Sequence, residues 1–217
     1  MGQGAMVTIS VAVLSLVLAT GLGAMGAIAK LSGGMLPGAG AQVYTTIVRG
    51  VPDLVLILLI YFGGQRLVND IGRSLGSDYI EVSKFWSGVV SIGFIYGAYL
   101  TETFRGAYLG VPRGQVDAAY ALGLTRAQAL WTVTLPQLLR HALPGYGNVW
   151  MVLVKSTAVV SVIGLEDLVG LADKAGKSTR EPFLFFTAVI LVYLSITAAS
   201  NWALTRVDTR LSRGIAR

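Results

Sequence analysis

The chain has 217 residues, of which 54% are hydrophobic and only 13% are charged, and its net charge at pH 7 is +6. Soluble domains carry about 25% charged residues, so a chain this apolar cannot cover a soluble globule with polar surface, and lipid is the expected solvent. With no cysteine and a single histidine, His141, the sequence excludes a disulfide framework, a thiol nucleophile and a His- or Cys-rich metal site. We expect no catalytic residue and no bound metal in this chain. Its basic residues are not interleaved with aromatic ones, which argues against nucleic-acid binding.

Five apolar segments follow one another along the chain, and each is expected to form a membrane-spanning helix. They cover residues 6–29, 45–64, 85–104, 146–165 and 182–205. A helix needs about 20 residues to cross the hydrocarbon, and helices are expected because lipid offers no partner for unpaired backbone groups. The second and third segments are short, so their ends are poorly defined. The expected fold is an all-α membrane protein in which residues 1–217 form a single transmembrane domain.

The first apolar segment carries no charge before Lys30, and three glycines, Gly21, Gly23 and Gly26, lie among small alanines in its second half. Small residues allow two helices to approach closely, so this stretch is a candidate for helix–helix contact. Glycine is also common in membrane helices without such a role, and the sequence leaves both readings open.

Positive charge is distributed unevenly between the loops. If Lys30 faces inwards, the inner segments hold ten Lys and Arg against four Asp and Glu, and the outer loops hold six against seven. The inner set ends with Arg206, Arg210, Arg213 and Arg217. Because basic residues collect on the cytoplasmic side of membrane proteins, we expect the N-terminus outside and the C-terminus in the cytoplasm. The polar segment between the third and fourth spans is then cytoplasmic.

Ionisable residues at membrane depth are costly and therefore indicate function. Asp53, near the start of the second span, could pair with a cationic ligand, cap its own helix or pair with Arg49 one turn back. Glu102 and Arg105 have helical i, i+3 spacing, which favours an ion pair with a structural or gating role over substrate contact. Lys155 must face a cavity, a partner carboxylate or a subunit interface. These five residues are the substrate or gating candidates.

The segment 112–137 is predicted to contain two short helices joined by a tight bend. Pro112 suits the start of the first helix, over 115–122, because its missing N–H is not needed there. Gly123 suits the left-handed residue that ends a helix. This segment is longer than a connection between two spans requires, so it is either a docking element or a solvated structural loop.

The second short helix of this segment has a start signal and a stop signal. Thr125 and Gln128 have the spacing of a capping box, in which each side chain accepts a hydrogen bond from the other residue's backbone. Pro136 is expected to stop or kink the helix near Leu135. One face of this helix, which could pack on a partner, carries Ala127, Leu130 and Trp131.

The same segment resembles the EAA loop of the membrane subunits of ABC importers. That pattern is Glu-Ala-Ala, three residues, Gly, nine residues and Ile-x-Leu-Pro, with Asp here in place of Glu at 117 and Val in place of Ile at 133. The resemblance implies that the loop inserts into a groove of an ATPase subunit on the cytoplasmic side. The residues expected to couple the chain to that ATPase are Asp117, Ala118, Ala119, Gly123, Thr125, Leu130, Leu135 and Pro136.

Three further blocks, residues 49–54, 99–107 and 155–158, resemble the polar amino acid uptake branch of these importers, and within it the Q-type subunits for histidine, lysine, arginine, ornithine or opines. The resemblance implies a bacterial inner-membrane permease that imports amino acids, basic ones in particular, by alternating access. Its implied partners are a second homologous membrane subunit, identical or not, two ATPase subunits and a periplasmic or extracellular solute-binding protein. ATP and magnesium would bind to the ATPase subunits, and this chain would hold no cofactor.

The alternative is a self-sufficient secondary transporter or channel for a small polar solute, which would work without an ATPase. Residues 176–179 read Gly-Lys-Ser-Thr, like the end of a phosphate-binding loop, but Leu171 stands where that loop requires glycine. Glu166, Asp167 and Asp173 gather acids in an outer loop without the spacing of a metal site or an acid–base pair. A docking or solvated role is expected for them.

Overall fold

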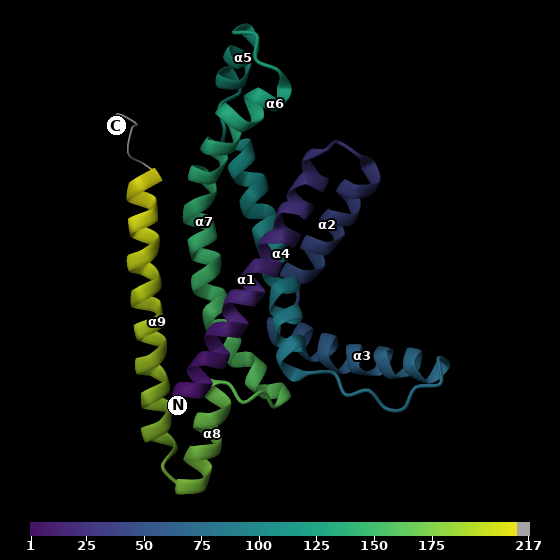
Figure 1. Ribbon diagram of the computed structural model, residues 1–217, viewed down its shortest axis with the longest axis vertical. Helices are drawn as coiled ribbons and strands as arrows, with labels where there is room; N and C mark the ends of the chain where they lie inside the picture. Colours follow the sequence, from purple (N-terminus) through teal and green to yellow (C-terminus); the bar gives the residue numbers. More distant parts are fainter. Residues whose placement is uncertain (212–217) are drawn as a thin grey trace.

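The computed structural model describes residues 1–211, which form helices joined by short connections, with no strand among them (Figure 1). The helices are α1 (Gly2–Leu31), α2 (Met35–Gly50), α3 (Asp53–Ser74), α4 (Lys84–Leu109), α5 (Arg113–Ala121), α6 (Arg126–Ala129), the π-helical turn η1 (Leu130–Thr134), α7 (Leu135–Ser156), the 3-10 helix η2 (Thr157–Ile163), α8 (Leu168–Thr179) and α9 (Pro182–Leu211). The all-α prediction is confirmed. Arg213 and Arg217, part of the expected charge asymmetry, lie outside the described residues.

By length and composition, four of the described helices could cross a membrane. They are α1, α3, the continuous helix over Arg126–Ile163, and α9. The predicted third span, α4, is not among them, because serine, glycine and tyrosine dilute its apolar residues. The same helix is buried along most of its length by its neighbours, so protein rather than lipid surrounds it. The count of five spans and the orientation of the termini stay predictions.

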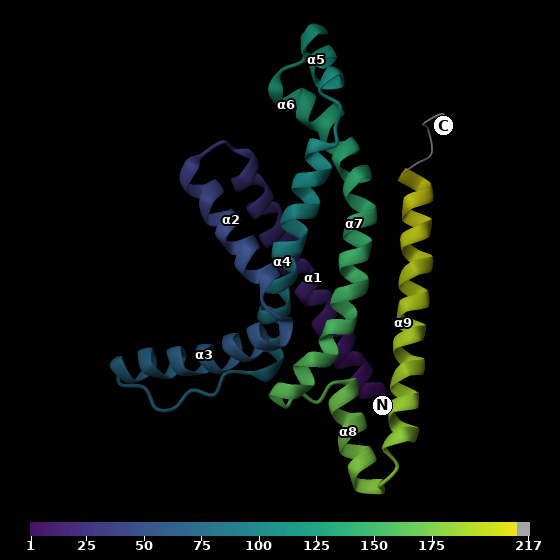
Figure 2. The ribbon, with the colours of Figure 1, turned by 180° about the vertical axis from the view of Figure 1, so that it is seen from behind.

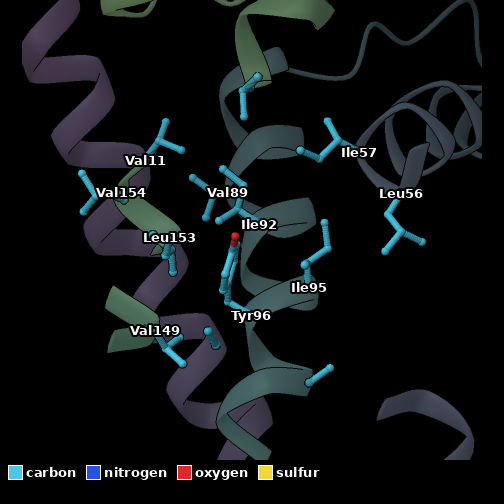
Figure 3. Close-up of a cluster of buried hydrophobic side chains, with 14 of the residues drawn as sticks. Val11, Leu56, Ile57, Val89, Ile92, Ile95, Tyr96, Val149, Leu153 and Val154 are labelled. Carbon is cyan, nitrogen blue, oxygen red and sulfur yellow. The ribbon is translucent and has the colours of Figure 1, made fainter. Parts of the chain in front are cut away.

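The core of the molecule lies where α1, α4 and α7 pack together (Figure 3). Its buried side chains include Val11, Val89, Ile92, Leu153 and Val154. A Cβ atom added to Gly23 would lie 2.6 Å from the Cβ of Leu100, and one added to Gly26 would overlap Thr101, whereas Gly21 has no such neighbour within 4 Å. Gly23 and Gly26 therefore permit the close approach of α1 and α4, and Gly21 does not contribute to it.

The second predicted span, residues 45–64, is not one helix. α2 ends at Gly50 and α3 begins at Asp53, with Val51 in an extended conformation between them. The reason is Pro52, which lacks an N–H to continue the helix and disfavours helical geometry at the residue before it. α3 then continues to Ser74, well beyond the predicted end, and runs across the direction of α4 in both views (Figures 1 and 2).

Pro136 was predicted to stop or kink the helix that follows the bend, and it does not stop it. α6, η1 and α7 form one continuous helix, whose π-turn leads the N–H of Leu135 back to the carbonyl of Leu130. A π-turn inserts one extra residue and widens the helix, which relieves the crowding that a proline ring causes against the preceding turn. Next to Pro136, the side-chain amide of Gln137 donates to the carbonyl of Val133 at 3.0 Å.

The two ends of the molecule are formed by different helices. α5 and α6 lie together at one end, beyond the ends of α4 and α7, while α8 and the N-terminus lie at the other (Figure 1). The bend between α5 and α6 is thus separated from α8 by the length of the bundle. That α5 and α6 are the cytoplasmic end is the prediction from charge.

Candidate functional site

The bend between α5 and α6, here called the coupling tip (residues 112–137), is held by a complete helix-end motif. Pro112 precedes the first turn of α5, and Gly123 has φ +82° after its last turn. The N–H of Gly123 donates to the carbonyl of Tyr120 at 2.9 Å, and that of Leu124 to Ala119 at 3.1 Å. This is the Schellman arrangement, in which a left-handed residue satisfies the last carbonyls of the helix. The predicted left-handed glycine is confirmed.

The start of α6 also has the predicted geometry. The N–H of Gln128 donates to Oγ1 of Thr125 at 3.4 Å, and the N–H of Thr125 donates to Oε1 of Gln128 at 2.9 Å. The capping box is therefore present. Together with the Schellman motif it sets the angle between α5 and α6 through local hydrogen bonds, so the tip keeps its shape without support from the bundle.

The coupling tip, at the predicted cytoplasmic end of the molecule, exposes large apolar side chains. Leu122 is 81% exposed and Trp131 is 69% exposed, with Tyr120 and Leu130 also exposed. Among the predicted coupling residues, those exposed are Asp117, Ala118, Gly123, Thr125, Leu130 and Pro136, whereas Ala119 is buried and Leu135 is half-buried. An apolar surface of this kind on a protruding element is typical of a protein–protein contact.

A cavity of about 450 Å³ lies against the coupling tip. Its lining includes Tyr108, Arg113, Asp117, Tyr120, Arg126 and Leu130. The end of α4, the helix α5 and the start of the helix that continues into α7 thus share one surface.

Glu102 lies at the centre of a charged cluster between α1, α2 and α4. Its Oε2 accepts from Nε of Arg105 at 2.9 Å, as the i, i+3 spacing predicts, and its Oε1 pairs with Nζ of Lys30. Lys30 also donates to Gln42 at 2.7 Å and to Thr45 at 2.6 Å, and its side chain is only 7% exposed. The sequence analysis used Lys30 only to infer how the chain is oriented in the membrane, because no sequence spacing connects it with a carboxylate 72 residues away.

Asp53 takes neither of the roles expected if it were purely local. It forms no cap on α3, and no ion pair joins it to Arg49 within residues 1–210. Instead its Oδ2 accepts from the hydroxyl of Tyr96 at 2.9 Å, and Ser156 lies 3.5 Å from the same oxygen. Asp53 therefore joins the break between α2 and α3 to α4 and to the end of α7.

Arg49 lines a second cavity, of about 430 Å³, between α2 and α4. Other lining residues are Gln42, Thr45, Tyr99, Glu102 and Arg105. The guanidinium carbon of Arg49 lies over the ring of Tyr99, 5.4 Å from its centroid. Tyr99 in turn stacks on Tyr96 with ring centroids 5.5 Å apart. The sequence analysis missed both tyrosines, although polar groups at 96, 99 and 102 share one helical face, which is a recognisable signal in an apolar helix.

Lys155 is the one candidate that the described chain leaves without a partner. It is exposed on α7, and no described residue forms an ion pair with it. An uncovered ammonium in a membrane helix has to face water or another subunit. The neighbouring Ser156 points the other way, towards Tyr96 and Asp53.

The acids at the opposite end of the molecule do not converge on a site. Asp167 is 1% exposed and caps α8 through the N–H of Gly170 at 2.8 Å, and burial raises the pKa of its carboxyl above the usual value. Glu166 pairs with Lys174, whose hydrogen bond lowers the pKa of Glu166, and Asp173 pairs with Lys177. No group of three or more His, Cys, Asp or Glu side chains placed to hold a metal was found in the part of the chain that the structure describes.

A family model described as "Binding-protein-dependent transport system inner membrane component" matches residues 19–213. The chain belongs to this family. The resemblance to importer membrane subunits inferred from the sequence is thereby confirmed. Members of the family are membrane components of a transport system, and the all-helical fold agrees with that membership.

Similar proteins agree with the family over nearly the whole chain. The histidine/lysine/arginine/ornithine transport system permease protein HisQ of Salmonella typhimurium is 48% identical, with 99% of this chain and 94% of HisQ covered. The octopine transport system permease protein OccQ of Rhizobium meliloti is 38% identical, with 97% and 89% covered. A solved amino acid ABC transporter with histidines has a TM-score of 0.79 at 30% identity, covering 96% of this chain and 92% of that one. The methionine transporter MetNI, at 18% identity and a TM-score of 0.68, shows the shared fold alone.

Proposed function

We propose that the chain is the membrane subunit of an ATP-driven importer and carries basic amino acids inwards by alternating access. The observation that carries this proposal is the coupling tip, a capped bend with an exposed apolar surface that continues directly into α7 and is joined to the end of α4 by residues 110–112. A secondary transporter or channel would have no use for such a surface. The assembly would lie in the bacterial inner membrane, with the N-terminus outside and the C-terminus in the cytoplasm.

The partners follow from the surfaces that the chain leaves uncovered. Each coupling tip would dock into one of two ATPase subunits, which bind ATP and magnesium, through Leu122 and Trp131. A second homologous membrane subunit, identical or not, would cover polar groups such as Lys155. A periplasmic or extracellular solute-binding protein would deliver the amino acid at the opposite end. The chain itself would bind no cofactor.

In the transport cycle the chain would transmit movement from the ATPase subunits to its membrane helices. ATP binding closes the two ATPase subunits, and their movement displaces the coupling tips. Because the tip is continuous with α7 and joined to α4 by residues 110–112, the displacement would tilt both helices and exchange the inward-open state for the outward-open state. The cycle runs because ligand and nucleotide bind the two states with different affinity.

The assignment of basic substrates is supported by the names of the relatives and by Asp53, a carboxylate held in place at the break between α2 and α3. Asp53→Asn keeps an acceptor for Tyr96 but removes the negative charge. We expect uptake of arginine, as kcat/KM, to fall about tenfold, since a hydrogen bond to a charged group contributes about 1.5–3 kcal/mol. Uptake of a neutral amino acid should change less than about twofold. Asp70→Asn, an exposed acid on α3, is the matched control.

The decisive experiment is reconstitution in liposomes of the chain with its membrane partner, ATPase subunits and binding protein. Uptake of basic amino acids should require ATP and should stop when the ATPase subunits are omitted. Uptake by the chain in the absence of any ATPase, driven by an ion gradient, would instead establish a secondary transporter or channel and end the proposal.

A further inference from the structure

A groove lies between α7 and α9, in the half of the bundle that is predicted to face the cytoplasm. Its volume is about 330 Å³, within the range typical of small-molecule sites, about 300–1,000 Å³. The two helices run side by side in both views (Figures 1 and 2) and touch beside the groove, where a Cβ atom added to Gly147 would lie 3.1 Å from Cδ1 of Leu204. Of the four candidate spans, α9 is the least covered by the rest of the chain, so most of its surface needs a partner from outside.

The lining of the groove changes from apolar to charged along its length. Met151 lies at the end nearer the middle of the predicted spans. Asn148 and Asn201 follow towards the cytoplasmic side, and Thr205 and Asp208 come after them at the far end of α9. A phospholipid has the same order of parts, because its acyl chains, ester groups and headgroup succeed one another from the middle of the bilayer to its surface.

The far end of the groove carries charges of both signs. Asp208 lines it, and Arg140 lies four positions before Pro144 of the lining, on the same face of α7. No ion pair involves Arg140 within residues 1–210. Pro144 has no N–H, so the carbonyl of Arg140 lacks the donor that a helix normally supplies. The groove therefore offers a carboxylate and a carbonyl to an ammonium group, and a guanidinium to a phosphate.

We propose that this groove binds one molecule of phosphatidylethanolamine, with the ammonium group of the lipid at Asp208 and its phosphate at Arg140. A primary ammonium group donates up to three hydrogen bonds, and a guanidinium binds phosphate through two parallel ones. The acyl chains then follow the apolar side of the groove past Met151 into the bilayer. The inference goes beyond the proposed function, since it requires only that the chain lies in a membrane and is independent of the transported solute.

The same ligand accounts for two amides inside the predicted spans. The side chains of Asn148 and Asn201 line the groove and are exposed. A polar group at this depth is costly unless it is paired, and the ester carbonyls of a lipid accept hydrogen bonds from amide N–H groups. Trp202 follows on α9, with the guanidinium carbon of Arg206 4.5 Å from the centroid of its six-membered or five-membered ring system. Tryptophan is enriched at membrane–water interfaces, which agrees with ester groups at this level.

The test compares phosphatidylethanolamine with phosphatidylcholine of the same acyl chains, because the quaternary ammonium of phosphatidylcholine has no N–H to donate. Each lipid is titrated into the purified assembly in detergent, and binding is measured by native mass spectrometry. The native assembly should bind phosphatidylethanolamine about tenfold more tightly, and Asp208→Asn should remove most of this preference. Arg140→Gln should weaken both lipids by a similar factor of about 3–10, because they share the phosphate. Arg210→Gln, two residues beyond Asp208 and therefore on the other side of α9, is the matched control and should change neither affinity.

Three outcomes would overturn the lipid site. Equal affinity of the native assembly for the two lipids would exclude recognition of the ammonium group. A preference that persists in Asp208→Asn would mean that the ammonium group binds elsewhere; Asp208 is exposed, so this replacement should leave the fold intact. A photoreactive residue introduced at Thr205 should crosslink to lipid, and crosslinking to the second membrane subunit would show instead that protein covers the groove. None of these measurements uses ATP or a transported solute, so their failure leaves the proposed function untouched.

Discussion

Replacement of Gly123 tests whether the shape of the coupling tip transmits movement. The backbone there has φ +82°, and an added Cβ would meet no heavy atom within 4 Å. The cost of an L-residue is therefore conformational strain alone, about 1–2 kcal/mol. A change of this size shifts a conformational equilibrium by a factor of about 5–30. The conformational strain should be larger in Gly123→Val than in Gly123→Ala, because a β-branched side chain tolerates the left-handed conformation least.

The assay for Gly123 is ATP-dependent uptake by the reconstituted assembly, measured together with ATPase activity and with the melting temperature. We expect uptake to fall in the order native, Gly123→Ala, Gly123→Val, while the melting temperature of the bundle stays within about 2 °C, because the tip is held by local hydrogen bonds. Gly123→Asn is the matched control, since asparagine also adopts the left-handed conformation and should retain most of the uptake.

Two results would refute this reasoning about Gly123. If the valine and asparagine variants transport equally well, the left-handed conformation has no role in coupling. If uptake and melting temperature fall together in the valine variant, the residue supports the fold rather than the transmission of movement.

Two further predictions concern packing and titration. Gly23→Val should destabilise the protein by about 1–3 kcal/mol, as expected for overpacking, because the added atoms meet Leu100 of α4; Gly21→Val, two residues away and facing open space, should leave the melting temperature unchanged. A larger decrease in melting temperature for Gly21→Val than for Gly23→Val would contradict the packing of α1 on α4. Burial raises the pKa of Asp167 in the folded protein, so the stability it contributes is full below the unfolded pKa of about 4 and is lost as pH rises through the folded pKa. Melting temperatures across this range should fall with rising pH, and Asp167→Asn, which can still accept from Gly170, should flatten the profile; an unchanged slope would show that Asp167 does not titrate there.

Sequence reasoning was most successful in the coupling tip, where each device acts within a few residues. Gly123 ends α5 through carbonyls three and four positions earlier, and Thr125 and Gln128 cap each other directly. Such motifs depend on backbone geometry that the residue types themselves favour. The lipid environment, the all-α fold and the Glu102–Arg105 ion pair were likewise predictable from composition and spacing.

The two prolines show where local rules are insufficient. One span was predicted over residues 45–64, yet Pro52 divides it into α2 and α3 at an angle. Pro136 was expected to stop or kink the helix near Leu135, yet a π-turn accommodates it and the helix continues into α7. In each case proline removes one hydrogen bond, and the surrounding packing decides whether the chain breaks or adapts.

The amino-acid sequence alone determined that the chain lies in lipid, that it is helical, and that its polar bend is capped, because burial of apolar surface and local hydrogen bonds depend on residue type and spacing. Only the tertiary structure decided which ionisable groups meet. Lys30 reaches Glu102 across 72 positions, and Ser156 reaches Asp53 across 103. These partners are selected by the angle and depth at which the helices cross, which close contacts such as Gly23 on Leu100 control. The crossing of two helices is a property of the packed bundle, and no short stretch of the chain contains it.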